Sequence, residues 1–141
     1  MATLDTGTPD LLATLDEGVL TLTMNRPEAR NAMSQAMNLA LQQQLASAEL
    51  DPAVKCIVLT GAGKGFCAGG DVKGMAARGD GTVGAQTIDE AIARQRINQR
   101  ATAGKLFKMP KPTIAALPGA AAGAGLRSEE RRVGKECSLP C

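Results

Sequence analysis

The clearest pattern of hydrophobic and polar positions lies between residues 34 and 50. Met37, Leu41 and Leu45 recur every fourth position, while residues 42–44 are all Gln. Apolar residues at this spacing share one face of an α-helix. The pattern therefore predicts an amphipathic helix over residues 34–50, ended by Asp51-Pro52 because the residue before a proline is disfavoured in helical conformation.

Short stretches of strand-like residues precede this helix. Residues 11–15 and 19–24 flank Asp16-Glu17-Gly18, where glycine suits a tight turn, and together they predict a β-hairpin. Residues 1–10 are rich in Thr, Asp, Gly and Pro. We expect them to form a loose N-terminus.

The most informative stretch begins at Cys56. Residues 56–60 are all apolar or β-branched, which predicts a strand buried on both faces, as in parallel sheets. Five glycines follow within residues 61–70, and then Asp71 and a possible short helix over residues 72–77. A glycine-rich loop after a buried strand can bring bare backbone N–H groups to a ligand and hold a developing negative charge.

The second half repeats this strand-and-loop arrangement. Residues 78–86 predict a surface loop, and Thr87-Ile-Asp-Glu90 matches a capping box that would start a helix carrying Ala93, Ile97 and Ala101 on one face. After a proline break, residues 113–117 predict another buried strand, and residues 119–125 form a second loop of small residues. The order indicates an α/β fold in which both loops meet at one end of a sheet.

Composition narrows the classes of function. The chain has 141 residues, enough for one domain, with a net charge of +2 and only 1% aromatic residues, so no nucleic-acid partner is expected. The sequence contains no histidine, which excludes His-based triads and His-ligated metals, and we expect no metal site. Neither a signal peptide nor a membrane-length apolar run is evident, and four cysteines without paired spacing favour reduced thiols in the cytoplasm.

Three chemistries compete for the first loop. A phosphate-binding P-loop fails because Val58 and Gly65 occupy positions that require glycine and a hydroxyl residue. A dinucleotide-binding domain remains an alternative, since Gly63-Lys-Gly-Phe-Cys-Ala68 formally fits its fingerprint. The third reading pairs the two loops: backbone N–H groups of Gly70 and Ala124 would form an oxyanion hole for a thioester carbonyl.

Several segments, in order, resemble the enoyl-CoA hydratase/isomerase (crotonase) family over residues 11–126. They are Asn25-Arg-Pro-Glu28, Arg30-Asn-Ala-Met33, the segment from Ile57 to Asp71, Lys111-Pro-Thr-Ile-Ala-Ala116 and Gly119-Ala-Ala-Ala-Gly-Ala-Gly-Leu126. The resemblance implies a crotonase-like spiral of ββα units, incomplete at the C-terminus, that binds an acyl-CoA. It also implies a homotrimer or hexamer for the full-length parent, and no cofactor, because coenzyme A is part of the substrate.

The resemblance also assigns site residues. Gly70 would supply the first oxyanion N–H and Ala124 the second. The residues that would lie along the CoA, largely through backbone contacts, are Ala29, Arg30, Ala68, Asp71, Val72 and Lys73. Lys64 and Lys73 are candidates for contacts with the CoA phosphates. The implied reaction is enoyl-CoA hydration, the addition of water across a 2-enoyl double bond, with an enoyl-CoA or ring-epoxide acyl-CoA isomerase as the alternative.

The sequence changes character at Arg127. Residues 127–136 carry seven charges, and residues 127–137 resemble the translation of a DNA-sequencing adapter, so residues 127–141 are interpreted as an artefactual tail. In hydratases of the family a catalytic glutamate lies three residues after the second donor, where this chain has Arg127. We therefore expect this chain to lack the acid/base half of the site and to be inactive.

Overall fold

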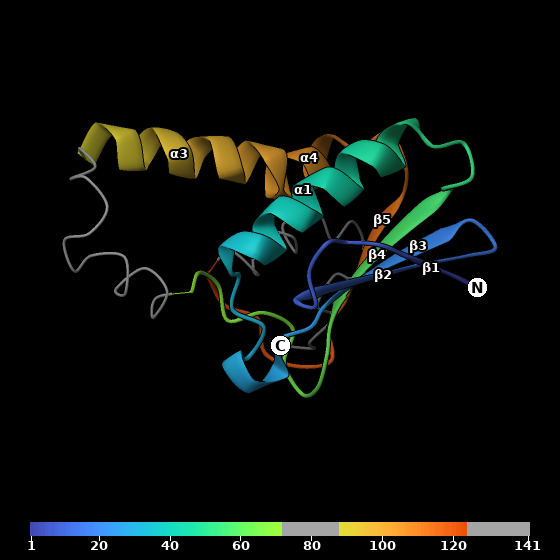
Figure 1. Ribbon diagram of the computed structural model, residues 1–141, viewed down its shortest axis with the longest axis horizontal. Coiled ribbons are helices and arrows are strands. Elements are labelled where there is room, and N and C mark those ends of the chain that lie inside the picture. Colours follow the sequence, from blue (N-terminus) through green and yellow to red (C-terminus); the bar gives the residue numbers. More distant parts are fainter. Residues whose placement is uncertain (72–87, 124–141) are drawn as a thin grey trace, which may run out of the picture.

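The protein, described from a computed structural model, is built on one five-stranded sheet with helices packed against it (Figure 1). The structure describes residues 1–71 and 88–123. The strands lie in sequence order, β1 (Ala2–Leu4), β2 (Leu11–Asp16), β3 (Val19–Met24), β4 (Cys56–Gly61) and β5 (Thr113–Ala116). The predicted α/β class is confirmed.

The sheet is antiparallel at its start and parallel at its end. β2 and β3 form the predicted hairpin, with Glu17 and Gly18 at positive φ of 48° and 86° in the turn. β3 pairs parallel with β4, and β4 pairs parallel with β5, as expected for two strands followed by loops at the same end. The loose N-terminus predicted for residues 1–10 is wrong for β1, which pairs antiparallel with β2. The strand forms because it can pair with the edge of β2, although its three residues are too few to show an apolar pattern.

The main helix, α1 (Gln35–Leu50), confirms the prediction for residues 34–50. Ser34 is its N-cap, and the Ser34 hydroxyl accepts a hydrogen bond from the Met37 N–H at 3.0 Å. The ammonium group of Lys111 donates to the carbonyl oxygens of Ala48 and Asp51 at the other end. Both ends of α1 therefore have polar partners for backbone groups that the helix itself leaves unpaired.

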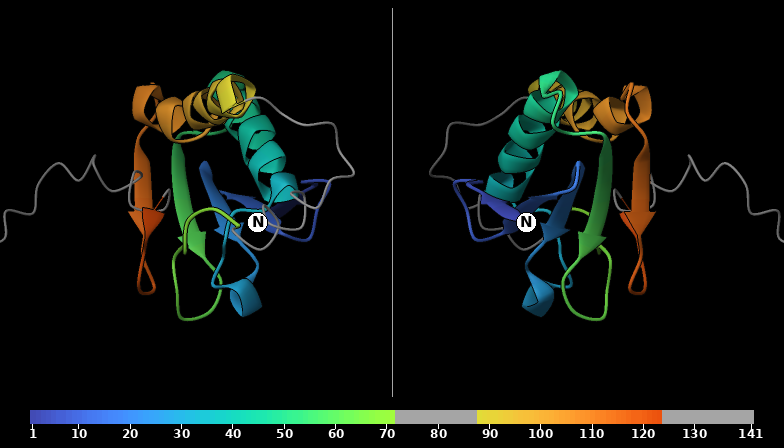
Figure 2. Two further views of the ribbon diagram at one scale, coloured as in Figure 1. Left: turned by 90° about the vertical axis from the view of Figure 1, so that its left-hand side faces the viewer. Right: turned by 90° about the vertical axis from the view of Figure 1, so that its right-hand side faces the viewer.

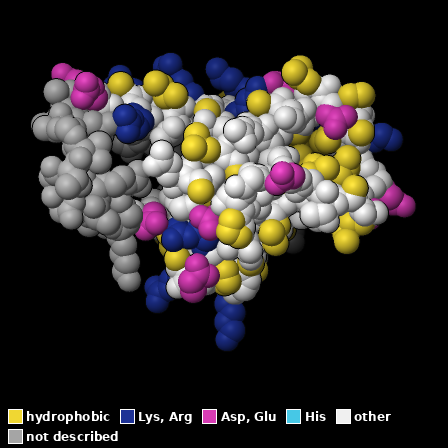
Figure 3. Space-filling view, in the orientation of Figure 1, with side chains coloured by type: hydrophobic (Ala, Val, Ile, Leu, Met, Phe, Trp, Pro, Cys, Tyr) yellow, Lys and Arg dark blue, Asp and Glu magenta, His cyan; other side chains and the backbone are white. Residues whose placement is uncertain are grey.

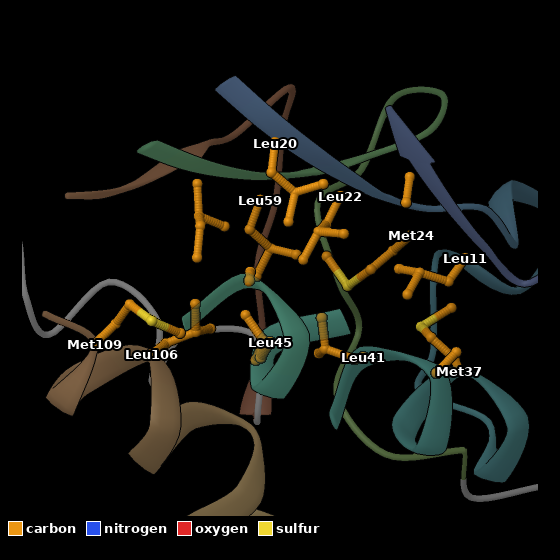
Figure 4. Packing of buried hydrophobic residues seen from close by; sticks show 14 of the residues in the cluster. Leu11, Leu20, Leu22, Met24, Met37, Leu41, Leu45, Leu59, Leu106 and Met109 are labelled. Atoms are coloured by element: carbon orange, nitrogen blue, oxygen red, sulfur yellow. The ribbon is translucent and has the colours of Figure 1, made fainter. Parts of the chain in front are cut away.

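The hydrophobic core lies between the sheet and the helices on one of its faces. Figure 4 shows side chains of β2, β3 and β4 meeting those of α1 and α4 (Ala103–Lys108). The core is almost wholly aliphatic, and its largest fully buried side chains include Phe66, Leu11, Leu20, Leu22, Met24, Met37, Leu41, Leu45 and Ile57.

The expectation that β4 is buried on both faces is wrong. Ile57, Leu59 and Gly61 are buried, whereas Cys56, Val58 and Thr60 alternate with them and are only half-buried. The helices that the structure describes cover one face only. An apolar run cannot reveal this difference, because hydrophobic residues occupy both faces of the strand.

The second helical region is divided in two. α3 (Ile88–Ala101) begins where the capping box predicted, although Thr87 itself lies outside the described residues. A break at Thr102 separates α3 from α4, and Figure 1 shows α3 continuing from α4 away from the strands. Ala93 and Ile97, predicted on one apolar face, are exposed, with 64% of Ile97 accessible. The arginines of α3 are also exposed, and Lys and Arg side chains lie along the upper edge in Figure 3.

Some predictions fall outside the two described ranges. These are the short helix over residues 72–77, the loop over residues 78–86 and the tail over residues 127–141. Among the described helices, none is long and apolar enough to cross a membrane.

Candidate functional site

The two glycine-containing loops lie at the carboxyl ends of β4 and β5. Figure 2 shows both loops and the 3₁₀-helix η1 (Pro27–Ala29) beyond the arrowheads of the parallel strands. This is the edge at which open parallel sheets usually bind ligands. The prediction that the loops meet at one end of the sheet is confirmed.

Asn31 holds the first loop in place. Its side chain is fully buried, and Nδ2 donates to the carbonyl oxygens of Ala62 and Gly65, each at 2.9 Å. Oδ1 accepts from the Arg26 N–H at 2.9 Å. Asn31 also adopts a positive φ of 55°, a conformation that asparagine tolerates better than most residues. One side chain thus links the start of the loop to the segment before α1.

The beginning of the loop is too tightly packed for any side chain at position 61. A Cβ on Gly61 would lie 2.3 Å from the Phe66 carbonyl oxygen and 2.8 Å from Asn31 Nδ2. Real Cβ atoms do not approach backbone oxygens so closely. Glycine at this position therefore allows the chain to turn back on itself directly after β4.

The two loops are hydrogen-bonded to each other. The Phe66 N–H donates to the Ala120 carbonyl at 3.0 Å, and the Ala122 N–H donates to the Cys67 carbonyl at 2.8 Å. A Cβ on Gly123 would lie 3.4 Å from Gly69 Cα, so the residues preceding the two expected donors lie side by side. Ala124 itself is outside the described residues, as are Val72 and Lys73.

Gly70 presents its backbone to solvent. The residue is exposed, and it forms an isolated parallel bridge with Met33, whose N–H donates to the Gly69 carbonyl at 2.8 Å. Within residues 1–71 and 88–123, no hydrogen bond joins the Gly70 N–H to a protein acceptor. An exposed donor with no acceptor in the described part of the chain can receive a ligand oxygen.

Several expected CoA-contacting residues surround this position. Ala68 is exposed, and its N–H donates to the Arg30 carbonyl at 3.0 Å. Arg30 is exposed, and Ala29 is half-buried at the end of η1. Two segments that are almost forty positions apart in the sequence therefore meet beside Gly70. Lys64 is also exposed in the first loop.

Asp71 differs from the other expected contact residues, because its side chain points into the protein. One carboxylate oxygen accepts from Arg26 Nη1 at 3.1 Å, and the carboxylate is only 19% exposed. The side chain is therefore engaged in an internal ion pair.

The thiol beside the loop is not a nucleophile. Burial raises the pKa of the Cys67 thiol, and the hydrogen bond from the Gly69 N–H to its sulfur, at 3.4 Å, acts in the opposite direction. The thiol therefore stays protonated at neutral pH. Cys56 and Cys67 are both free, and the described residues contain no cluster of Cys, Asp and Glu suited to a metal ion.

Comparisons with known proteins agree with this arrangement. The family model described as enoyl-CoA hydratase/isomerase matches residues 14–128. The chain belongs to the enoyl-CoA hydratase/isomerase family. The fingerprint of a dinucleotide-binding domain also lacks its structural context, because residues 62–71 form a loop in which no helix begins.

Individual members of the family are similar to this chain over most of its length. The 1,2-epoxyphenylacetyl-CoA isomerase of Escherichia coli K12 is 39% identical over 115 residues, which cover 82% of this chain and 42% of the relative. The enoyl-CoA hydratase EchA19 of Mycobacterium tuberculosis is 37% identical over 131 residues, covering 89% of this chain and 44% of the relative.

The fold is also that of solved family members. The crystal structure of an enoyl-CoA hydratase/isomerase from Xanthobacter autotrophicus Py2 matches with a TM-score of 0.73 and 32% identity, covering 84% of this chain and 42% of that one. The chain spans about two fifths of the length of the curated relatives it matches, 42% of the first.

Sequence reasoning missed two residues of this family member that organise the site. Arg26 and Asn31 stand in segments that resemble the family, but no role could be assigned to either residue from its sequence position. Asn31 could have been suspected, since a short polar residue between a proline turn and a helix often adopts positive φ. No sequence pattern could predict the ion pair between Arg26 and Asp71, because the two residues are 45 positions apart.

Proposed function

We propose that this chain binds an acyl-CoA thioester, whose carbonyl oxygen accepts a hydrogen bond from the Gly70 N–H. The Ala124 N–H is the second donor of the same oxyanion hole. The observation that carries this proposal is that Gly70 is an exposed residue whose N–H has no acceptor within the described residues, beside two loops that are hydrogen-bonded to each other. Contact between Gly69 and Gly123 supports the pairing of the two donors.

The chemistry follows from where charge develops. When a nucleophile adds to a 2-enoyl thioester, negative charge moves onto the carbonyl oxygen, which becomes an enolate oxygen. Fixed N–H donors stabilise that charge by about 3 kcal/mol each in the transition state. We propose hydration of an enoyl-CoA as the reaction of the full-length parent, with water adding across the double bond.

The other contact residues keep the roles that the resemblance implies. Ala29, Arg30 and Ala68 lie along the CoA with the backbone of Asp71, followed by Val72 and Lys73. Lys64 is a candidate contact for a CoA phosphate. We propose that the 141-residue chain alone is inactive, because Arg127 stands where the family's hydratases carry a glutamate. Acid–base groups of this kind contribute roughly 100- to 10,000-fold to the rate.

An isomerase is the second candidate for the parent. The observation that favours it is the 39% identity to the E. coli protein named 1,2-epoxyphenylacetyl-CoA isomerase. An enolate oxygen requires the same two donors in either reaction, so the oxyanion hole does not separate them. Tighter binding of phenylacetyl-CoA than of crotonyl-CoA would favour the ring-acyl isomerase, and the reverse order would favour the hydratase.

We further propose that the full-length parent is a cytoplasmic homotrimer or hexamer. The family resemblance supports the assembly, and the free thiols of Cys56 and Cys67 suit a reducing compartment. Light scattering on the purified parent would measure its mass, and a monomer would contradict the assembly. Fractionation of expressing cells would test the compartment.

The binding proposal is tested by calorimetric titration with crotonyl-CoA and with free CoA, which lacks the thioester carbonyl. Gly70→Pro removes the N–H, and Gly70→Ala is the matched control that retains it. A single neutral hydrogen bond of about 1 kcal/mol corresponds to roughly a fivefold change in Kd. We expect wild type and Gly70→Ala to prefer crotonyl-CoA and Gly70→Pro to lose this preference. Equal affinity of the wild type for crotonyl-CoA and CoA would refute the proposal.

A further inference from the structure

Arg26 joins two segments that carry the first loop. Its Nη1 donates to the Ala32 carbonyl at 2.8 Å and to an Asp71 carboxylate oxygen at 3.1 Å. Its Nε lies 3.7 Å from a carboxylate oxygen of Asp10. All three charged side chains are largely buried, with 20% of Arg26, 19% of Asp71 and 25% of Asp10 exposed.

Both segments held by Arg26 adjoin the bridge that contains Gly70. Ala32 directly precedes Met33, and Asp71 directly follows Gly70. Met33 and Gly70 are bridge partners, and the Met33 N–H donates to the Gly69 carbonyl at 2.8 Å. One guanidinium group therefore ties the two sides of this isolated bridge together, next to the exposed residue Gly70.

We propose that Arg26 is a positioning residue, which fixes the direction of the Gly70 N–H by clamping Ala32 and Asp71 on either side of the bridge. The effect of Arg26 on catalysis rests on the oxyanion role proposed for Gly70. An isolated bridge has no neighbouring ladder to extend it, so the side-chain contacts of Arg26 add to the few backbone hydrogen bonds that orient the Gly70 peptide. Precise orientation of a donor is what makes it useful to a developing oxyanion.

The clamp requires an arginine. A planar guanidinium reaches several acceptors in fixed directions, whereas a lysine ammonium is a compact charge on a flexible stem. Here one nitrogen serves a carbonyl and a carboxylate, and a second nitrogen faces another carboxylate. Lysine could keep the charge but not these three directions together.

The same network reaches helix α1. The Ser34 hydroxyl donates to the Asp10 carboxylate that faces Arg26, and this hydroxyl also caps the helix. The network thus connects the first loop to the first turn of α1 as well as to the segment that precedes β2. A rigid helix and strand then support a donor that is itself in a loop.

The first test measures the clamp without any ligand, by amide hydrogen exchange of Met33 followed by NMR. Arg26→Lys and Asp71→Asn each weaken the clamp, and Lys105→Met breaks the comparably exposed Lys105–Glu49 pair far from the loop as a control. We expect Met33 to exchange at least 10-fold faster, relative to amides of β3, in the two clamp variants but not in Lys105→Met. Using β3 as reference removes any change in global stability.

The second test measures the consequence for a thioester carbonyl. With crotonyl-CoA and CoA as ligands, the preference is the ratio of the two dissociation constants, and both clamp variants should lose at least half of the wild-type ratio. Lys105→Met should retain the full preference.

The two tests separate this inference from the binding proposal. Unchanged Met33 exchange in both clamp variants would overturn the role of Arg26, whatever the ligands do. Faster exchange with an intact preference for crotonyl-CoA would also overturn it, since the clamp would then not position the donor. A wild type without any preference would refute the oxyanion role of Gly70, while the exchange data would still decide whether Arg26 clamps the loop.

Discussion

Replacing Asn31 by aspartate tests how the first loop is held. Asn31→Asp keeps the size of the side chain, and aspartate also tolerates the positive φ of 55°. The variant removes both N–H donors that reach Ala62 and Gly65, and it retains the oxygen that accepts from the Arg26 N–H. The variant also places a carboxyl oxygen opposite those two carbonyl oxygens, so the change tests both the lost hydrogen bonds and the burial of the new acid.

The expected cost follows from the burial of this side chain. Asn31 is 0% exposed, so the new carboxyl group is removed from water, and it faces the carbonyl oxygens of two half-buried residues. A buried polar group that loses its partner costs about 1–3 kcal/mol, and the two lost hydrogen bonds together with the buried acid should lower the free energy of unfolding by at least about 4 kcal/mol. That is roughly a thousandfold change in the unfolding equilibrium constant.

Urea unfolding followed by circular dichroism measures this cost. Asn38→Asp is the matched control, because the Asn38 side chain is only half-buried and its Nδ2 donates one hydrogen bond, to the Ser34 carbonyl. The control should lose less than about 1 kcal/mol. If Asn31→Asp were no more destabilising than Asn38→Asp, Asn31 would not be the anchor of the loop.

Three further predictions concern the surroundings of the site. Gly61→Ala should lower the free energy of unfolding by more than about 3 kcal/mol, because the new Cβ would lie 2.3 Å from a backbone oxygen. Gly65→Ala should be nearly neutral, because its Cβ would lie 3.9 Å from the nearest backbone oxygen, and similar urea midpoints for the two variants would contradict this. Lys111→Met should cost about 2 kcal/mol in the same assay, since the last turn of α1 loses its cap; an unchanged midpoint would refute the cap. Because burial raises the pKa of Cys67, its contribution to stability should be complete below the ordinary thiol pKa and should decline as pH rises above it. Peptide mass spectrometry should accordingly find Cys67 alkylated more slowly than Cys56 at pH near 9, and equal rates in the folded protein would contradict this burial effect.

The elements with strong periodicity could be predicted from the sequence. The apolar stripe of α1 and the uninterrupted run in β4 each indicated the correct element. The hairpin turn at Gly18 was marked by its own local chemistry. These signals are local, since each depends on residues within a few positions of one another.

Features that depend on distant partners could not be predicted in the same way. β1 has only three residues, too few to show an alternating pattern, and it forms because β2 offers an edge for pairing. The half-buried face of β4 depends on where the helices pack. The clamp between Arg26 and Asp71 joins residues 45 positions apart. The expected donor Gly70 could be proposed from the glycine pattern, but its orientation depends on these long-range contacts.

The central claim is that the N–H groups of Gly70 and Ala124 both point at one thioester oxygen. NMR spectra of ¹⁵N-labelled protein titrated with crotonyl-CoA, with free CoA as control, test it most directly. We predict that both amide protons shift downfield with crotonyl-CoA and that neither does so with CoA, because only crotonyl-CoA carries a thioester carbonyl. Saturating crotonyl-CoA that leaves both amide resonances where CoA leaves them would contradict the account.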